Sequence, residues 1–201
     1  GVQTCALPIC NKILDVVYKL GQLKVNMDNI HIAAEKTAKI VFALKNYSHV
    51  SQTDILIPTN LNESLENILT LYNNQIKQGV EVIRNFADLP LIPVYPDEIG
   101  QVWTNIIHNA LYAMKYNGKL ELQTLDEGSM VAVQITDSGP GIKPDILHRI
   151  FEPFFTTKPQ GEGTGLGLDI CRKIVEKHNG QLAVESVPGK TTFTIKLHKH
   201  Q

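Results

Sequence analysis

The fold of this chain is decided by a stretch that opens with Asp137-Ser138-Gly139-Pro140-Gly141-Ile142 and closes with Gly163-Thr164-Gly165-Leu166-Gly167-Leu168. Glycine at this density weakens the interior of a helix or strand, so the stretch does not build a core. It suits a place where the backbone approaches a ligand closely and offers N–H groups to an anion. The second motif leads into an amphipathic run, so those N–H groups and the positive end of a helix dipole point to one place. The pattern predicts a phosphate-binding turn.

Composition sets the broad class of the protein. With 201 residues, 43% of them hydrophobic and 19% charged, the chain can form one globular domain plus a smaller appendage. The net charge of −1 gives no reason to expect nucleic acid or an anionic membrane as partner. No apolar run approaches the roughly 20 residues of a membrane span, and the three cysteines form neither a disulfide framework nor a metal-ligand pair. We expect no membrane contact by this fragment and a cytoplasmic location; whether the intact protein is membrane-anchored stays open.

The first quarter of the chain reads as helical. Residues 1–10 show no period and contain Pro8, which indicates a scar or a disordered end. Residues 11–20 resemble the tail of a helix, with a turn at Gly21. A seam of apolar residues in steps of three and four then runs from Met27 to Ser48. The pattern over residues 11–52 therefore predicts a partial helical hairpin. This hairpin could be a plain one or half of a dimeric four-helix bundle, and the pattern favours neither.

Helices mixed with strands follow. We expect an edge strand at 54–58, a helix from Asn60 or Asn62 to about 77, a strand at 80–86, an irregular connector at 90–96 and a helix at 97–115. Strands at 118–125 and 130–136 come next, then a helix at 169–178 and a final hairpin of strands at 181–187 and 191–197. Strands linked mostly by hairpins predict an α+β two-layer sandwich rather than a doubly wound parallel sheet.

Two features carry candidate chemistry. Asn105 and Asn109 lie four residues apart on the helix predicted at 97–115, where asparagine is a poor helix former and an amide oxygen can bind Mg²⁺ shared with phosphates. Asp137 follows an apolar strand, so its carboxylate can accept a hydrogen bond from an exocyclic amine such as that of adenine. Gly139 and Gly141 would let a flat ring approach the backbone. Taken singly, such asparagines are more often solvent-facing and such a motif is more often a plain turn.

The order of these segments resembles a known family. Asn105-Ile106-Ile107-His108-Asn109-Ala110, the motif from Asp137 to Ile142, Phe151-Glu152-Pro153-Phe154-Phe155-Thr156-Thr157-Lys158 and the motif from Gly163 to Leu168 closely resemble four boxes of sensor histidine kinases of two-component systems. These are the N, first glycine, phenylalanine and second glycine boxes of the GHKL ATPase group. Residues 27–49 are similar to the second helix of that family's dimerisation domain. The resemblance implies a GHKL-type α/β sandwich with a mixed, mostly antiparallel sheet over 53–201, preceded by a long bundle helix.

The resemblance also implies roles for individual residues. Asn109 would coordinate Mg²⁺ on the ATP phosphates, and Asn105 and Lys158 would be catalytic. Asp137 would bind the adenine amine, with Thr191 nearby. Residues 156–163 would form a mobile lid. The remaining cofactor-binding residues implied are Gly139, Gly141, Gly163, Gly165, Leu166 and Gly167.

The activity implied is that of a histidine kinase fragment. It would bind ATP and Mg²⁺, phosphorylate a histidine and pass the phosphoryl group to the receiver domain of a response regulator, as a homodimer through the bundle helices. None of the seven histidines is followed by Asp or Glu, so the acceptor histidine is expected outside this fragment. Asn105 stands where ATP-hydrolysing relatives carry glutamate, and an amide cannot act as a general base. The alternatives are a GHKL ATPase, an anti-sigma-type serine kinase and a non-catalytic dimerisation module.

Overall fold

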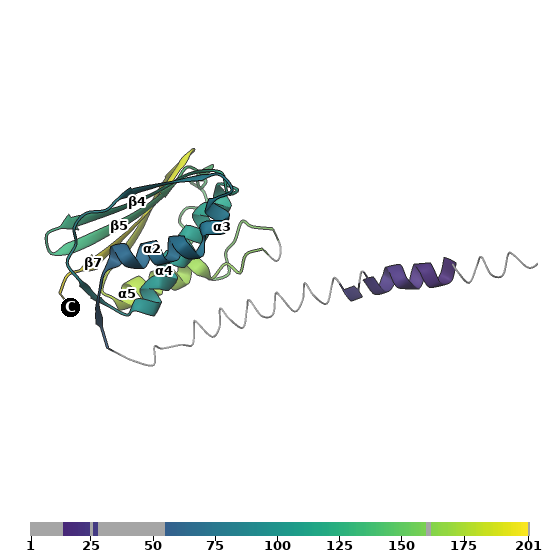
Figure 1. Ribbon diagram of the computed structural model, residues 1–201, viewed down its shortest axis with the longest axis horizontal. Coiled ribbons are helices and arrows are strands. Elements are labelled where there is room, and N and C mark those ends of the chain that lie inside the picture. The colour runs from purple at the N-terminus through teal and green to yellow at the C-terminus, as the bar shows by residue number, and fades with distance from the viewer. Residues whose placement is uncertain (1–13, 25, 28–54, 160–161, 201) are drawn as a thin grey trace, which may run out of the picture. The chain divides into compact units, whose positions relative to one another are not determined.

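The computed structural model describes residues 14–24, 26–27, 55–159 and 162–200. The chain divides into two units, Gly1–Ser48 and His49–Gln201. In the first unit, residues 14–24 form a helix that runs through Gly21 (Figure 1), so the turn predicted there is wrong. A single glycine costs a helix only about 1 kcal/mol, which the neighbouring residues can offset. The seam predicted beyond Met27 lies outside the described residues. Among those residues, no helix has the length and apolar character needed to cross a bilayer.

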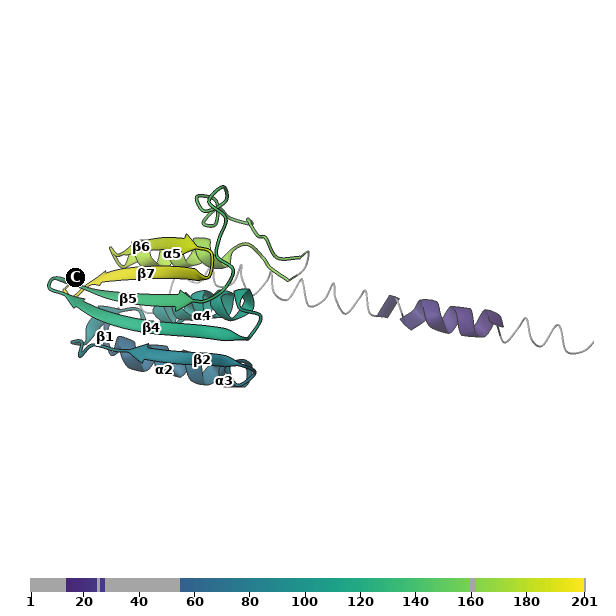
Figure 2. The same cartoon turned by 90° about the horizontal axis from the view of Figure 1, so that it is seen from above.

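The second unit is a two-layer sandwich. Its five strands lie in the order β2, β4, β5, β7, β6. One face of the sheet is covered by helices α2 (Leu61–Leu71), α4 (Pro96–Ala113) and α5 (Gly167–Lys177) (Figures 1 and 2). The pair β2–β4 is parallel and the other three pairs are antiparallel. The strands are β2 (Val80–Asn85), β4 (Gly118–Glu127), β5 (Met130–Asp137), β6 (Gln181–Val187) and β7 (Lys190–His198). The predicted α+β fold with a mixed, mostly antiparallel sheet is confirmed.

Alternation along the strands decides which side chains face the helices. In β7, Thr191, Phe193, Ile195 and Leu197 are buried at every second position. In β5 the buried series ends at Asp137, which is 4% exposed. Because side chains alternate between the two faces of a strand, Asp137 falls on the helix-covered face at the very end of β5. The sequence thus places a carboxylate at the rim of the core.

The helices carry one apolar face each. Helix α2 (Leu61–Leu71) begins at Asn60, whose side chain accepts the N–H of Glu63 at 3.2 Å, as predicted for an N-cap. It stops at Tyr72, and a short helix α3 (Asn73–Ile76) follows, so the helix predicted to 77 is interrupted. Helix α4 (Pro96–Ala113) and helix α5 (Gly167–Lys177) pack their apolar faces into the core, with Ile99, Val102, Trp103, Ile106 and Ile107 buried on α4 and Ile170, Cys171, Ile174 and Val175 on α5.

A small second sheet lies where an irregular connector was predicted. Strand β1 (Ile57–Thr59) pairs antiparallel with strand β3 (Ile92–Val94), so the connector at 90–96 is a wrong prediction. Pro58 and Pro93 stand opposite each other in this pair. Proline has no N–H to donate, and a two-stranded sheet can place such residues on its free edges. Strand β3 therefore forms by pairing with β1, although its proline argued against a strand in the sequence.

Candidate functional site

One stripe of α4 meets the other motifs that the sequence analysis identified. Asn105, Asn109 and Ala113 follow each other at four-residue spacing, so they lie on one side of the helix and span about 12 Å. The Asn105 side-chain N–H donates to the Gly167 carbonyl at 3.2 Å. The Asn109 amide oxygen accepts from Lys158 Nζ at 3.1 Å. The structure thus brings the first turn of α5 and the phenylalanine-containing segment to the two predicted asparagines.

The third residue of the stripe contacts the Asp137 motif. A Cβ built on Gly139 would lie 3.1 Å from Ala113 Cβ and 2.6 Å from Asp137 Oδ1, so only glycine lets the loop pass between them. The Asp137 motif therefore sits at the C-terminal turn of α4, one helical turn beyond Asn109. Asn109 and the loop that follows Asp137 therefore lie near the same side of α4.

Asp137 is a buried carboxyl, and one of its two oxygens accepts a hydrogen bond from the backbone. Its Oδ1 accepts the Gly139 N–H at 2.8 Å, which is the one hydrogen bond it makes among the described residues. Burial raises the pKa of Asp137 from its usual 3.8 to about 6, and the Gly139 N–H acts in the opposite direction. At pH 7 the group is mostly ionised, with its second oxygen available as an acceptor. A ligand amine would supply the hydrogen bond that this oxygen lacks.

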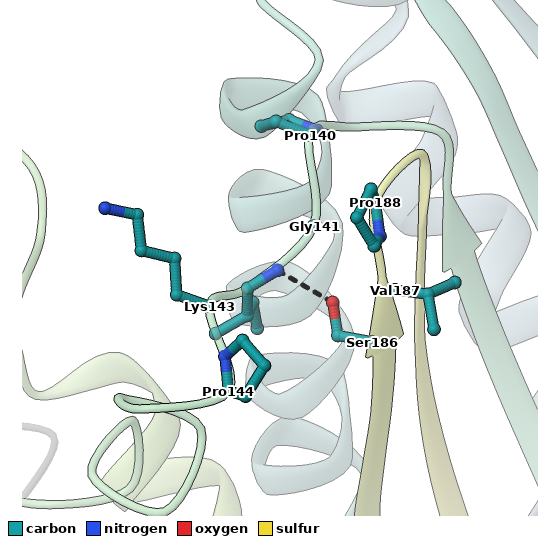
Figure 3. Close-up of a pocket in the computed structure, with 8 residues that line it drawn as sticks. Pro140, Gly141, Lys143, Pro144, Ser186, Val187 and Pro188 are labelled. Atoms are coloured by element: carbon teal, nitrogen blue, oxygen red, sulfur yellow. Dashed lines mark hydrogen bonds between the residues drawn. The ribbon is translucent and has the colours of Figure 1, made fainter.

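Thr191 lies beside Asp137 across the sheet. The register of β5 and β7 pairs Asp137 with Thr191, and that of β6 and β7 pairs Thr191 with Ser186. Thr191 Oγ1 lies 2.9 Å from Ser186 Oγ, which in turn accepts the Ile142 N–H at 2.7 Å (Figure 3). The resemblance implied Thr191 as a binding residue and did not include Ser186. The signal that could have found Ser186 is its place directly opposite Thr191 in the predicted hairpin.

Gly141 closes the loop against the same hairpin. Its φ of +83° is in the left-handed region, and a Cβ there would lie 2.5 Å from the Val187 carbonyl oxygen. Between the loop and the hairpin lies a pocket of about 280 Å³ (Figure 3). Its walls are Pro140, Gly141, Ile142, Lys143, Pro144, Ser186, Val187 and Pro188. Of the two glycines expected to line a base pocket, Gly141 borders this cavity, whereas Gly139 lies against α4.

The glycine-rich turn packs on the phenylalanine-containing segment. Gly165 has a φ of +68°, and a Cβ there would lie 2.3 Å from the Phe154 carbonyl carbon. A Cβ on Gly163 would lie 2.6 Å from Thr156 Oγ1. Leu166 is the N-cap of α5 and is 5% exposed, and the described residues provide no side-chain capping hydrogen bond at this end of the helix. The first N–H groups of the helix begin next to Asn105, which is the arrangement that an anion-binding helix N-terminus requires.

Lys158 contacts two side chains of α4. Its Nζ contacts Asn109 Oδ1 and lies 4.1 Å from the centre of the Tyr112 ring, and the Tyr112 hydroxyl donates to Glu162 at 2.6 Å. Burial lowers the pKa of Lys158, and the negative charge of Glu162 opposes this shift. The resemblance to sensor histidine kinases implied a catalytic role for Lys158. The structure adds that its ammonium group lies on the oxygen predicted to bind the metal.

A metal ion fits this site only together with a ligand. Among the described residues there is no group of three or more His, Cys, Asp or Glu side chains that could hold a metal. Asn109 Oδ1 already faces a cation, the Lys158 ammonium. Mg²⁺ commonly takes a few protein oxygens and completes its shell with phosphate oxygens and water. The donor set is therefore adequate for Mg²⁺ that arrives with a polyphosphate.

Comparison with known proteins gives one family match, one relative in sequence and two similar structures. A sequence model described as "Histidine kinase-, DNA gyrase B-, and HSP90-like ATPase" matches residues 95–201. Sensor histidine kinase ZraS of Salmonella typhimurium is 38% identical over 142 residues, which cover 69% of this chain and 30% of ZraS. The nucleotide-free catalytic domain of histidine kinase ThkA superposes with a TM-score of 0.66 at 34% identity, covering 72% of this chain and 96% of that domain. ThkA in complex with the response regulator protein TrrA also shares the fold, with a TM-score of 0.70 at 24% identity, covering 98% of this chain and 62% of that one. The chain spans about a third of the length of the curated relatives it matches.

Proposed function

The chain belongs to the family of histidine kinase-, DNA gyrase B- and HSP90-like ATPases, and from this premise we propose that residues 53–201 are the ATP-binding catalytic domain of a sensor histidine kinase. The observation that carries the proposal is the α4 stripe. Asn105, Asn109 and Ala113 contact the α5 turn, Lys158 and the Asp137 loop respectively. Groups suited to a purine amine and to phosphates therefore lie along one helix.

ATP would lie along this stripe. Asp137 would accept a hydrogen bond from the adenine amine, with Thr191 beside it and Gly139 and Gly141 shaping the loop. The phosphates would contact Lys158 and the turn formed by Gly163, Gly165, Leu166 and Gly167. Their negative charge matches the N-terminus of α5 and the Lys158 ammonium.

Asn109 would hold Mg²⁺ through its amide oxygen. When bound, the ion would neutralise charge on the phosphates. For Asn109 to serve this role, Lys158 must leave Oδ1, and the phosphates offer its ammonium group a new partner. Lys158 would then hold the terminal phosphate in place.

The reaction would be phosphoryl transfer controlled by positioning. Asn105 fixes the start of α5 through its hydrogen bond to Gly167 and has no basic group with which to activate water. This favours transfer to a protein acceptor over hydrolysis. The acceptor would be a histidine of the intact protein, and the phosphoryl group would pass to an aspartate of a receiver domain. The complex of ThkA with TrrA supports this class of partner. Because ATP is the phosphoryl donor, we place the reaction in the cytoplasm.

Residues 11–52 would belong to the dimerisation hairpin of the intact protein. The helix over 14–24 and residues 26–27 leave large apolar side chains exposed, namely Leu14, Val16, Val17, Tyr18, Leu20, Leu23 and Met27. Apolar side chains along a helix call for a partner surface. We propose a second copy of the chain in the intact protein as that partner.

The decisive experiment supplies the missing acceptor. The chain is incubated with Mg²⁺, ATP labelled in its γ-phosphate, and a separately produced helical bundle of the intact protein that carries the acceptor histidine. Acid-labile, base-stable label on the bundle supports the proposal. Acid-stable label on serine would assign a serine kinase, and rapid release of phosphate without labelled protein would assign an ATPase. Absence of ATP binding in calorimetry would leave only the non-catalytic alternative.

A further inference from the structure

Three polar side chains form a row across the sheet. Asp137 on β5, Thr191 on β7 and Ser186 on β6 are directly opposite one another in register, so they share one face of the sheet. Asp137 and Thr191 are each 4% exposed. The row ends at the loop that follows Asp137, where the Ile142 N–H donates to Ser186 Oγ at 2.7 Å (Figure 3).

The hydrogen bond between Ser186 and Thr191 can run in either direction, and one of the two directions gives each hydroxyl proton a use within the site. Ser186 Oγ accepts from Ile142 and has one proton to give. Among the described residues, the other hydrogen bond of Ser186 Oγ is with Thr191 Oγ1, at 2.9 Å. If Ser186 donates to Thr191, the Ser186 oxygen accepts one hydrogen bond and its proton donates another. The reverse direction would leave the Ser186 proton with no acceptor in the described part of the chain.

This direction fixes what Thr191 can offer a ligand. Once Thr191 Oγ1 accepts from Ser186, its own proton is left to point toward the ligand side of the row, next to Asp137. The row then presents an acceptor, the Asp137 oxygen, beside a donor, the Thr191 hydroxyl. Adenine matches this pair, since its amine donates and the adjoining ring nitrogen accepts. Guanine presents an acceptor oxygen and a ring N–H instead. Its oxygen would face the Asp137 acceptor, and its N–H would face the Thr191 donor.

We propose that Ser186 is a positioning residue that makes Thr191 a hydrogen-bond donor beside Asp137, and that loss of the Ser186 hydroxyl shifts the choice between adenine and guanine. The inference rests on the proposed nucleotide-binding function, in which Asp137 and Thr191 meet the base, and adds to it a residue that acts on base choice from outside that contact. Ser186 would act without touching the base. Its bond to Ile142 also ties the loop to the hairpin, and Gly141 packs against Val187 at the same place.

The test is the ratio of affinities for ATP and GTP, each measured with Mg²⁺ by calorimetry on the full chain. Ser186→Ala is expected to weaken ATP binding by about tenfold and to leave GTP binding nearly unchanged, so the ratio falls by about tenfold. Ser186→Thr keeps the hydroxyl and should retain the ratio. In a Thr191→Val background, Ser186→Ala should change the ratio little, because the donor it orients is already absent.

Ser138→Ala is the matched control. Ser138 Oγ also accepts a backbone N–H, that of Lys119 at 2.8 Å, but on the other side of the same loop. Its removal should leave the ratio unchanged. If Ser186→Ala does not fold, the near-isosteric Ser186→Cys takes its place and must lower the ratio, because a thiol is a weak donor.

Two results would overturn the proposal. Equal losses of ATP and GTP affinity in the Ser186 variants would make Ser186 a structural residue only. Additive effects of Ser186→Ala and Thr191→Val would show that the two hydroxyls act separately. If the wild-type chain binds neither nucleotide, the proposed function itself fails, which is a different outcome from a chain that binds ATP without the expected change in ratio.

Discussion

Lys158 Nζ lies 3.1 Å from Asn109 Oδ1, on the oxygen that we assign to Mg²⁺. The same ammonium group lies over the Tyr112 ring, whose hydroxyl holds Glu162. The Lys158 ammonium group thus occupies the position where Mg²⁺ is proposed to bind. Binding of ATP with Mg²⁺ would exchange one for the other, and Lys158 would move from an amide oxygen to a phosphate.

Replacement of Lys158 by methionine should separate the two roles of its ammonium group. We expect ATP affinity to fall by about tenfold, because a charge-assisted hydrogen bond to phosphate is lost. The Mg²⁺ concentration needed for half-maximal binding should also fall, because no ammonium competes for Asn109 Oδ1. Calorimetry at a series of Mg²⁺ concentrations measures both. Lys158→Arg is the control that keeps the charge, and a higher Mg²⁺ requirement in Lys158→Met would contradict the exchange.

Tyr112→Phe should loosen the segment around Lys158 without removing a proposed phosphate contact. The ring remains to contact Lys158, but the hydrogen bond to Glu162 at 2.6 Å is lost. We expect faster amide hydrogen exchange at residues 156–159 in the nucleotide-free chain, with little change elsewhere. Unchanged exchange in this segment would show that the Tyr112–Glu162 bond does not hold it.

Asp137→Asn should raise the stability of the nucleotide-free protein and lower its affinity for ATP. A pKa of about 6 in place of 3.8 means that the buried ionised carboxyl costs about 3 kcal/mol at pH 7. A neutral amide avoids this cost, so we expect the free energy of unfolding to rise by about 1–2 kcal/mol. ATP affinity should fall at least about tenfold with the loss of the charged acceptor.

The pH dependence of that difference has a definite sign. Because the folded-state pKa of Asp137 is raised, its stabilising contribution is present below about pH 4 and is lost as the pH rises through about 6. Urea unfolding of both proteins between pH 4 and 7 should show the advantage of Asp137→Asn growing with pH. An advantage that is constant or shrinks over this range would rule out burial as its cause.

Gly165→Ala should disrupt the glycine-rich turn by contact and not only by backbone strain. Its Cβ would lie 2.3 Å from the Phe154 carbonyl carbon, at a φ of +68°. Gly128→Ala is the matched control, because Gly128 has a φ of +79° and no atom within 4 Å of its Cβ position. Both variants should lose about 1 kcal/mol to strain, but only Gly165→Ala should lower ATP affinity, by about tenfold or more. Equal affinities in calorimetry would show that the turn makes no contact with ATP.

His178 should make the domain sensitive to acid. It is fully buried, its Nδ1 lies 2.7 Å from the Ile174 carbonyl oxygen, and its Nε2 accepts the Tyr95 N–H at 3.0 Å. Burial lowers the pKa of His178; the Ile174 carbonyl and Glu98 oppose this, and Lys177 reinforces it. Protonation of Nε2 would break the bond to Tyr95.

A lowered pKa means that the unfolded chain takes up the proton first, so stability is present above about pH 6.5 and falls as the pH drops below it. The free energy of unfolding in urea should therefore decrease between pH 7.5 and 6. In His178→Phe this part of the pH dependence should disappear, even though the variant is less stable at pH 7.5. A slope equal to that of the wild type would assign the titration to another group.

The sequence predicted most of the elements of the second unit, because their signals are local. Alternating apolar residues gave β4, β5 and the final hairpin, and the Asn60 cap gave the start of α2. Strand β3 was not predicted, because it contains a proline and proline disfavours a strand. It forms because its backbone pairs with that of β1. Gly21 was predicted as a turn and is helical, because one glycine is a weak signal against a run of helix-forming neighbours.

What the sequence by itself determined is the identity of the groups: Asn105 and Asn109 on one side of a helix, a carboxylate at the end of a strand, and glycines where the chain must turn. Local spacing fixes these features, since each depends on residues a few positions apart. Only the tertiary structure decided which of them meet. Lys158 contacts Asn109 across 49 positions of sequence and Asn105 contacts Gly167 across 62, while Ser186 reaches Ile142 across 44. Such contacts depend on the register of the sheet and on how α4 packs against it, and these are set by burial of the whole core.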